Sequence, residues 1–436
     1  MGGAGETGGG AALALYLMLA RSARQPSGGA PQRPEAWPPR PPGGVVWLHA
    51  GGAASLPAAV RLVHALREGA AGPRAGAGGP KPEAAVITVA PEAAALPAPA
   101  DLPGDVFCLP APADALMPVR AFLDHWRPDR AAFVGGGLRP AAINQAWLRR
   151  IPLVHLDAPA PRLAAISPRW VPGLARATAR RFDRILARDA AARRAFERAG
   201  VPAGRLELGG ALQDGPPPLP HAEAERAALA HVVGTRPIWA ALGPNTAEEA
   251  AIIEAHATAR RHSHRLLLVL VPDDPARGPE VAARMAAAFP DGVARRGAEQ
   301  EPDAETAVYV ADTEGEDGLW LRLATIVFLG GTLAAGGARV LHPFAAAAFG
   351  AAVVHGPHLP QGLRRATDDL DAARAARTVA GAPELAAAIG DLLAPDTAAA
   401  SAHAAWEVIS ARDAATERAA RLLAEATAPG DARGAG

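Results

Sequence analysis

The stretch VVWLHAGG at residues 45–52 decides the fold class. Residues 45–49 are a short, mostly apolar run, and Gly51 and Gly52 close it, which is typical of a buried strand followed by a turn. Residues 56–66 then carry apolar side chains at helical spacing. The segment as a whole therefore predicts a strand, a turn and a helix in that order.

The same alternation continues toward the carboxyl terminus. A helical pattern occupies residues 117–126, and short apolar runs typical of strands occupy residues 85–89, 106–109, 131–134, 153–156 and 184–187. Strands that alternate with helices indicate a parallel sheet that is covered by helices on both faces.

A proline-rich break, GPPPLP at residues 215–220, separates this series from a second one. Helical patterns there occupy residues 247–261, 319–324 and 384–426, and strand patterns occupy residues 237–242, 265–271, 307–311, 326–329 and 351–355. The prediction is an α/β protein of GT-B type, with doubly wound Rossmann-like domains at residues 45–215 and 216–436. Ligands are expected in a cleft between them, beyond the carboxyl ends of the strands.

The amino terminus carries the apolar run AALALYLMLA at residues 11–20, followed by Arg21 and Arg24. A membrane-spanning helix needs about 20 apolar residues, so this run is short. We interpret residues 1–24 as a hydrophobic anchor that lies in the membrane surface, with a frayed terminal helix as the alternative. Residues 25–44 are rich in proline and glycine and predict a linker.

Composition excludes several classes of function. The chain of 436 residues has 44 basic and 44 acidic side chains, which gives no general attraction to nucleic acid. Cys108 is the only cysteine, so neither an intramolecular disulfide nor a cysteine metal site is possible. The histidines do not have metal-ligand spacing. No metal or cofactor is predicted.

Several motifs follow one another in an order and spacing that resemble the bacterial transferases of Kdo (3-deoxy-D-manno-octulosonic acid). These are WLHA at 47–50, WAAL at 239–242 with EE at 248–249 and EAH at 254–256, the strand 266–271 with Pro272 and Pro275, DTEGE at 312–316, VFLGGT at 327–332, GG at 336–337 with Pro343, and GPH at 356–358.

The resemblance implies an enzyme at the cytoplasmic face of the bacterial inner membrane that moves Kdo from CMP-Kdo to a lipid A precursor. It implies a glutamate in the first domain as general base on the acceptor hydroxyl, and a second domain that binds the CMP part of the donor. The base position falls on Ser55. The implied donor-binding positions are Pro272, Asp273, Glu314, Gly315, Glu316, Gly331, Thr332, Gly337, Arg339 and His342.

Many polar residues of the family are replaced. A serine hydroxyl is not a base near neutral pH, so Ser55 is better interpreted as a helix cap. Residues 135–140 lack two acids of the family pattern, and Asp273 and Asp274 replace an arginine and a histidine that would hold phosphate. Two acids beside a phosphate would repel it.

Other positions keep polar groups. Arg339, which follows a glycine turn, is a candidate phosphate partner, with a surface arginine as the alternative. Glu314 and Glu316 either accept hydrogen bonds from sugar hydroxyls or are solvated acids.

Three hypotheses remain open from the residues. The chain is an active Kdo or related sugar transferase, a catalytically inactive binding or regulatory paralogue, or a GT-B enzyme with a different nucleotide-sugar donor.

Overall fold

The computed structural model describes residues 12–18, 37–52, 55–70, 84–90, 104–163, 173–212, 214–215, 219–290, 292–337 and 339–426. Most of the predicted linker, residues 25–36, lies outside this set, as do residues 216–218 of the proline-rich break. The chain forms two compact units. We call residues 1–214 with 411–436 the N-terminal unit, and residues 215–410 the C-terminal unit.

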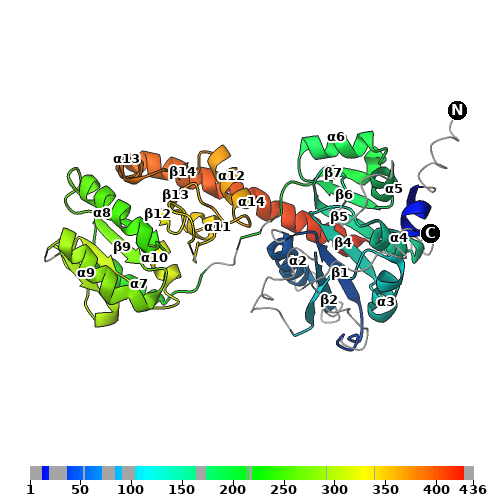
Figure 1. The fold of residues 1–436 in the computed structure, drawn as a ribbon, viewed down its shortest axis with the longest axis horizontal. Coiled ribbons are helices and arrows are strands. Elements are labelled where there is room, and N and C mark those ends of the chain that lie inside the picture. Colours follow the sequence, from blue (N-terminus) through cyan, green and yellow to red (C-terminus); the bar gives the residue numbers. More distant parts are fainter. Residues whose placement is uncertain are drawn as a thin grey trace. The chain divides into compact units, whose positions relative to one another are not determined.

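The N-terminal unit contains a seven-stranded sheet in the order β3-β2-β1-β4-β5-β6-β7 (Figure 1). Every strand pairs in parallel with its neighbours. The strands are β1 (Val45–Ala50), β2 (Ala84–Val89), β3 (Val106–Pro110), β4 (Arg130–Val134), β5 (Leu153–Ala158), β6 (Arg184–Ala187) and β7 (Leu206–Leu208). Because β1 pairs with both β2 and β4, the order of the strands reverses there, and such a switch point favours ligand binding.

Helices cover both faces of this sheet because side chains alternate along each strand. Val45 and Trp47 pack on one face in a core with α3 (Leu116–Trp126), α4 (Pro140–Leu148), α5 (Leu174–Ala179) and α6 (Ala190–Arg198). Val46 and Leu48 pack on the other face, against α2 (Ser55–Ala70) and the last turns of α14 (Pro395–Glu425).

The end of the chain corrects the predicted domain division. The sequence placed residues 411–436 in the second domain, but they belong to the N-terminal unit. Ala415, Ala419 and Leu423 are buried in the same core as α2. The Arg412 guanidinium also forms a buried ion pair with Asp214. Hydrophobic burial and this ion pair therefore hold the end of α14 on the first sheet.

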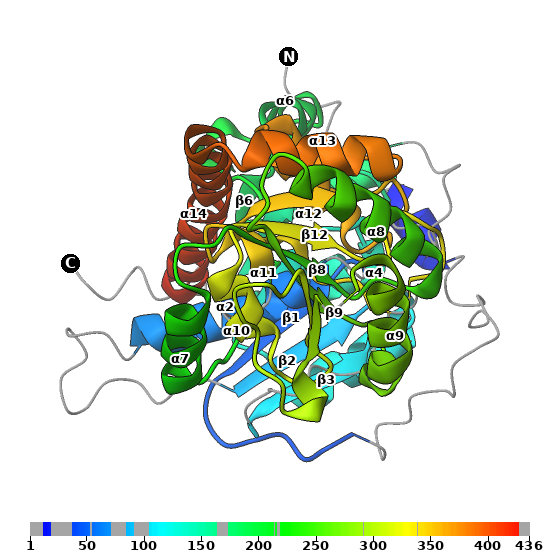
Figure 2. The same ribbon diagram turned by 90° about the vertical axis from the view of Figure 1, so that its left-hand side faces the viewer.

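The C-terminal unit contains a second seven-stranded sheet, in the order β10-β11-β9-β8-β12-β13-β14. Figure 2 shows its central strands β9, β8 and β12. The sheet is also parallel throughout. Its strands are β8 (Ile238–Leu242), β9 (Leu267–Val271), β10 (Val293–Arg295), β11 (Val308–Val310), β12 (Ile326–Leu329), β13 (Ala352–His355) and β14 (Ala376–Thr378). The predicted fold class, a GT-B pair of doubly wound Rossmann-like domains, is confirmed by these two sheets.

Two layers of helices enclose the second sheet. One core contains side chains of α8 (Thr246–Arg260), α9 (Gly278–Ala288) and α13 (Ala382–Leu392). The other contains side chains of α7 (Glu223–Val233), α10 (Asp317–Leu323), α11 (Pro343–Ala347) and α12 (Arg364–Ala372). The long carboxyl-terminal helix is divided, because α13 ends at Leu392 and a new helix begins at Pro395.

The apolar amino-terminal segment is helical at residues 12–18. Leu13 and Tyr16 are buried in the core of the N-terminal unit, whereas Leu15 and Met18 are exposed. The Tyr16 hydroxyl donates to the Asp114 carboxylate at 2.7 Å. One face of the predicted anchor thus packs on the protein. Within the part of the chain that the structure describes, no helix is long and apolar enough to cross a membrane.

Candidate functional site

The predicted donor-binding residues lie in the loops that follow three parallel strands of the C-terminal unit. Pro272 and Asp273 follow β9, residues 314–316 follow β11, and residues 331–342 follow β12. Because β9 pairs with β11 and β8, and β8 pairs with β12, all three loops leave the same carboxyl edge of the sheet. This is the edge at which parallel sheets of this kind commonly bind ligands.

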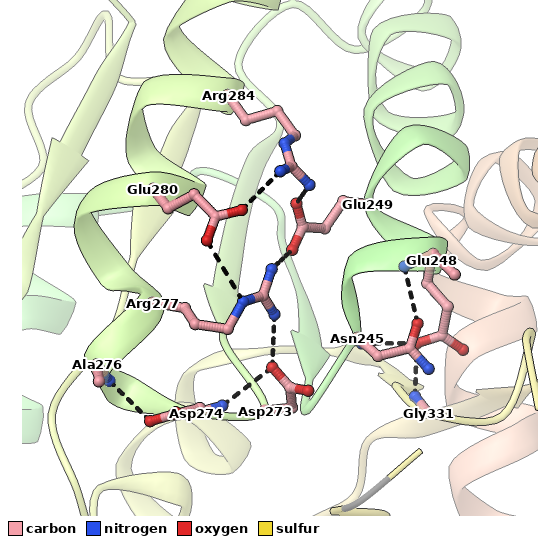
Figure 3. A network of polar contacts seen from close by, with 11 residues as sticks. Asn245, Glu248, Glu249, Asp273, Asp274, Ala276, Arg277, Glu280, Arg284 and Gly331 are labelled. Carbon is pink, nitrogen blue, oxygen red and sulfur yellow. Dashed lines mark hydrogen bonds and ion pairs between the residues drawn. The ribbon is translucent and has the colours of Figure 1, made fainter. Parts of the chain in front are cut away.

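At the end of β9, a network of charged side chains surrounds Arg277 (Figure 3). Its guanidinium donates to Asp273 at 2.6 Å and also pairs with Glu249, whose carboxylate is only 1% exposed. Glu249 pairs in addition with Arg284, which itself contacts Glu280 at 2.6 Å. The negative charge of Asp273 is therefore balanced within the protein. Asp274 accepts from the backbone N–H of Ala276 at 2.9 Å and starts a short 3₁₀ turn.

A second buried carboxylate, that of Glu248, organises the loop after β12. It accepts hydrogen bonds from the backbone N–H groups of Gly331 at 2.6 Å, Leu333 at 2.6 Å and Ala334 at 3.2 Å. It also accepts from Asn245, so it completes a capping box at the start of α8. Backbone N–H groups of this kind commonly bind phosphate. Here a side chain of the protein already occupies them.

Thr332 connects the ends of β12 and β13. Its buried hydroxyl donates to the carbonyl of Leu329 and accepts from the N–H of Gly356 at 2.7 Å. Glycine is required around it, because a Cβ at Gly356 would lie 2.2 Å from the Thr332 carbonyl oxygen. Likewise, a Cβ at Gly337 would lie 2.4 Å from the Cα of Gly331, where φ is +75°. Gly331 and Thr332 thus shape the edge of the sheet through their backbone.

Arg339 lies beside this glycine turn. A Cβ built on Gly331 would lie 3.5 Å from the carbonyl oxygen of Arg339. The Arg339 guanidinium pairs with Asp317, the first residue of α10, and remains partly exposed. His342 precedes α11, where its Nδ1 accepts from the N–H of Phe344 at 3.2 Å. Within the part of the chain that the structure describes, the turn therefore offers an arginine with unused donors at the edge of the sheet.

In the loop after β11, some acidic side chains form hydrogen bonds within the protein and others are exposed to solvent. Glu316 holds the Arg296 guanidinium through contacts of 2.5 and 2.7 Å, and these bonds raise the pKa of Arg296. Asp312 accepts from the N–H of Gly297 at 2.7 Å. Glu314 and Gly315 are exposed, and Gly315 has a φ of +78°. Of the acids predicted to accept from sugar hydroxyls, Glu314 is therefore the more accessible.

Ser55 is in the N-terminal unit, at the first residue of α2. It is buried, and its Oγ would be 2.6 Å from a Cβ built at Gly135 in the loop after β4. The hydroxyl thus faces the glycine loop in which the family's two acids are missing. The predicted cap and the structure agree on the start of the helix within one residue.

Two buried histidines lie below this loop. Burial lowers the pKa of His155 to about 4, and its Nε2 is 3.3 Å from the Gly135 carbonyl oxygen. Burial, followed by the charge of Arg139, also holds the pKa of His49 well below its usual value, and its Nδ1 contacts Thr88 Oγ1 at 3.0 Å. Both rings are neutral at neutral pH. Neither is accessible enough to contact an acceptor directly.

Sequence reasoning missed four of the charged groups that shape these edges. Glu248 and Glu249 stood in a matched motif, but their burial has no signal in a single sequence. The other two are Asp157 and Arg188, which form an ion pair at the edge of the first sheet. Across the described residues, no cluster of three or more histidine, cysteine or acidic side chains could hold a metal ion. Cys108 is half-buried on β3, and burial raises the pKa of its thiol.

The two parallel sheets define the fold first, a GT-B pair of doubly wound Rossmann-like domains. Comparison with known proteins then shows which family the chain resembles. Residues 22–213 match the family model described as 3-deoxy-D-manno-octulosonic-acid transferase (kdotransferase). The resemblance to the Kdo transferase family, which the motifs predicted, is thereby confirmed.

Individual relatives are distant. The chain is 28% identical over 262 residues to the 3-deoxy-D-manno-octulosonic acid transferase of Haemophilus influenzae, covering 58% of this chain and 59% of that protein. It is 31% identical over 186 residues to the enzyme of Bordetella pertussis, covering 42% and 43%. The matched part thus spans about half the length of these relatives.

Solved structures give similar but loose matches. The C-terminal CMP-Kdo binding domain of WaaA from Acinetobacter baumannii is 24% identical, covers 43% of this chain and 99% of that one, and has a TM-score of 0.39. A putative UDP-N-acetylglucosamine 2-epimerase from Listeria monocytogenes is 16% identical, covers 87% and 95%, and has a TM-score of 0.47.

Proposed function

We propose that this protein is a glycosyltransferase that moves Kdo from CMP-Kdo to a lipid A precursor, as part of lipopolysaccharide synthesis. The observation that carries the proposal is the match of residues 22–213 to the Kdo transferase family. In the reaction, the acceptor hydroxyl attacks the anomeric carbon of Kdo and loses its proton. The bond from that carbon to the phosphate oxygen breaks, and CMP leaves.

The donor is expected at the carboxyl edge of the second sheet. Arg339 is the partly exposed cation beside the glycine turn, and a guanidinium with unused donors suits a phosphate. Glu314 is an exposed acid on the neighbouring loop and suits a ribose or sugar hydroxyl. Asp273 has a different role, because it is committed to Arg277.

We further propose that the protein works at the cytoplasmic face of the bacterial inner membrane, where the lipid acceptor is. The helix at residues 12–18 supports this, because it is fixed to the N-terminal unit through Tyr16 and leaves Leu15 and Met18 exposed. Exposed apolar side chains on a helix favour the membrane interface.

Calorimetric titration of the full chain with CMP-Kdo tests the donor assignment. We expect binding that Arg339→Met weakens at least tenfold. The matched control is Arg261→Met. It removes the same charge from an exposed residue that directly follows the carboxyl end of α8. Binding of a UDP-sugar in place of CMP-Kdo would contradict the proposal in favour of a different donor. No binding of any nucleotide would favour an inactive or re-purposed paralogue.

A further inference from the structure

An ion pair joins two neighbouring strands at the carboxyl edge of the first sheet. Arg188 follows β6 and Asp157 is near the end of β5, so neighbouring parallel strands deliver them to the same edge (Figure 1). The Arg188 guanidinium donates to Asp157 through Nε at 2.7 Å and through Nη2 at 3.1 Å. Nη2 also donates to the Asp157 backbone carbonyl at 3.2 Å.

The local backbone departs from a regular strand to make this arrangement. Asp157 has a φ of +48°, which costs free energy for a residue other than glycine. The register between β5 and β6 shifts between His155 and Ala158. The Asp157 carboxylate is consequently turned inward and is only 1% exposed, whereas the Arg188 side chain remains 30% exposed. A surface salt bridge would need no such distortion.

The pair adjoins the position of the family's general base. A Cβ placed on Gly135 would be 2.6 Å from Ser55 Oγ and 3.6 Å from Arg188 Nη2. The serine hydroxyl and the guanidinium therefore border the same point, in the loop after β4. Because β1 and β4 are the strands at which the strand order reverses, this point is where a doubly wound sheet usually binds ligands.

The other titratable groups nearby are committed elsewhere. The His155 ring is neutral and lies under Gly135. The Asp189 carboxylate accepts from the N–H of Ala192 at 2.7 Å and caps α6. Asp157 uses the Nε and Nη2 side of the guanidinium, so among the described residues the two N–H groups of Nη1 are the donors left for a ligand.

From these positions we propose an oxyanion-binding subsite, in which Arg188 contacts the anion, Asp157 positions the guanidinium and Ser55 donates from its hydroxyl. The ligand is a phosphate monoester or a carboxylate. Assigning that anion to the acceptor rests on the proposed function, whereas the subsite itself does not. In such an arrangement a residue that binds the acceptor stands where the family has its base.

Titration of the full chain with inorganic phosphate, in a buffer free of other oxyanions, tests the subsite. We expect Arg188→Met to weaken phosphate binding at least tenfold. The matched control is Arg193→Met, which removes an exposed arginine of α6 that pairs with Glu197 and should leave binding unchanged within twofold. Competition by acetate would assign the subsite to carboxylates, and its absence would assign the subsite to phosphate monoesters.

Arg188→Met removes the guanidinium that pairs with the buried Asp157 carboxylate, so folding needs its own control. The double variant Asp157→Asn with Arg188→Met removes both charges and should fold while still losing phosphate. Phosphate binding that is equal in the wild type and in this double variant would overturn the subsite, as would no binding to the wild type. If the protein transfers Kdo but Arg188→Met does not weaken phosphate binding, the proposed function holds and the subsite is wrong. If Arg188→Met weakens phosphate binding but the protein does not transfer Kdo, the subsite holds and the proposed function is wrong.

Discussion

The Glu248 carboxylate accepts a hydrogen bond of 2.6 Å from the backbone N–H of Gly331, and so joins the start of α8 to the loop after β12 (Figure 3). Its remaining hydrogen bonds go to the N–H groups of Asn245, Leu333 and Ala334. The negative charge is buried, and backbone dipoles stabilise it. The loop that the sequence predicts as donor-binding is thus shaped by an internal anion.

Replacing Glu248 by glutamine tests this role. The side-chain amide keeps one accepting oxygen and adds donors that would face the N–H groups, so at least one buried group loses its partner. We expect the free energy of unfolding to fall by about 1–3 kcal/mol, measured by urea denaturation. Glu254→Gln, an exposed position on the same helix, is the control and should change it by less than about 0.5 kcal/mol. Equal effects at both positions would disprove the role of Glu248.

Glu249 links two arginines and is the next test. Glu249→Gln removes the charge that both Arg277 and Arg284 contact, and we expect a loss of about 2 kcal/mol in unfolding free energy. Glu280 contacts the same two arginines but is 54% exposed. Glu280→Gln should therefore cost less than about 1 kcal/mol. A larger loss for the Glu280 variant would mean that burial does not decide which acid holds the network.

The return of the chain to the N-terminal unit depends on Asp214 and Arg412. Asp214→Ala leaves the Arg412 guanidinium buried without its carboxylate, and we expect unfolding to become easier by about 3–5 kcal/mol. Glu417→Ala removes an exposed acid on α14 that is 3.9 Å from Arg421, and should change little. Thermal unfolding followed by circular dichroism measures both. Similar melting temperatures for the two variants would argue against the placement of residues 411–426.

The stability of the N-terminal unit should depend on pH through His155. Burial lowers its folded-state pKa to about 4, whereas an unfolded histidine titrates at about 6.5. Between these values the unfolded chain binds more protons, so the stabilisation is complete above pH 6.5 and is lost as the pH falls. From pH 7 to pH 5 we expect a loss of about 2 kcal/mol from this residue.

His155→Gln tests that expectation, because the amide can still donate to the Gly135 carbonyl but does not titrate in this range. The decline of unfolding free energy from pH 7 to 5 should be about 2 kcal/mol smaller in the variant. His403→Gln, at an exposed position of α14, should follow the wild type. An unchanged decline in the His155 variant would show that the ring is protonated without penalty.

The sheets could be predicted from the sequence because their strands are buried on both faces and are continuous apolar runs, as at residues 267–271. The edge strands β7, β10 and β14 escaped prediction, because each has three residues and mixed polarity. Assignment of residues 411–426 also failed. The alanine pattern of α14 does not indicate which of the two sheets its last turns pack against.

The site was harder to predict than the fold. Motif order located the loops after β9, β11 and β12, but it could not show which polar groups are already engaged. From the sequence alone, Asp273 would be expected to repel a phosphate. Only the structure shows that Arg277 pairs with its carboxylate. Arg188 and Asp157 are 31 residues apart and match no motif. Parallel strands bring together such pairs from positions that a single sequence does not connect.

The central claim is transfer of Kdo by this chain, and one assay tests it most directly. Purified protein is incubated with CMP-Kdo and a lipid A precursor, and both CMP and the glycosylated lipid are quantified. We expect equal amounts of the two products, and neither when the lipid is omitted. No glycosylated lipid above the level of a protein-free control, under conditions in which the protein is folded, would contradict it.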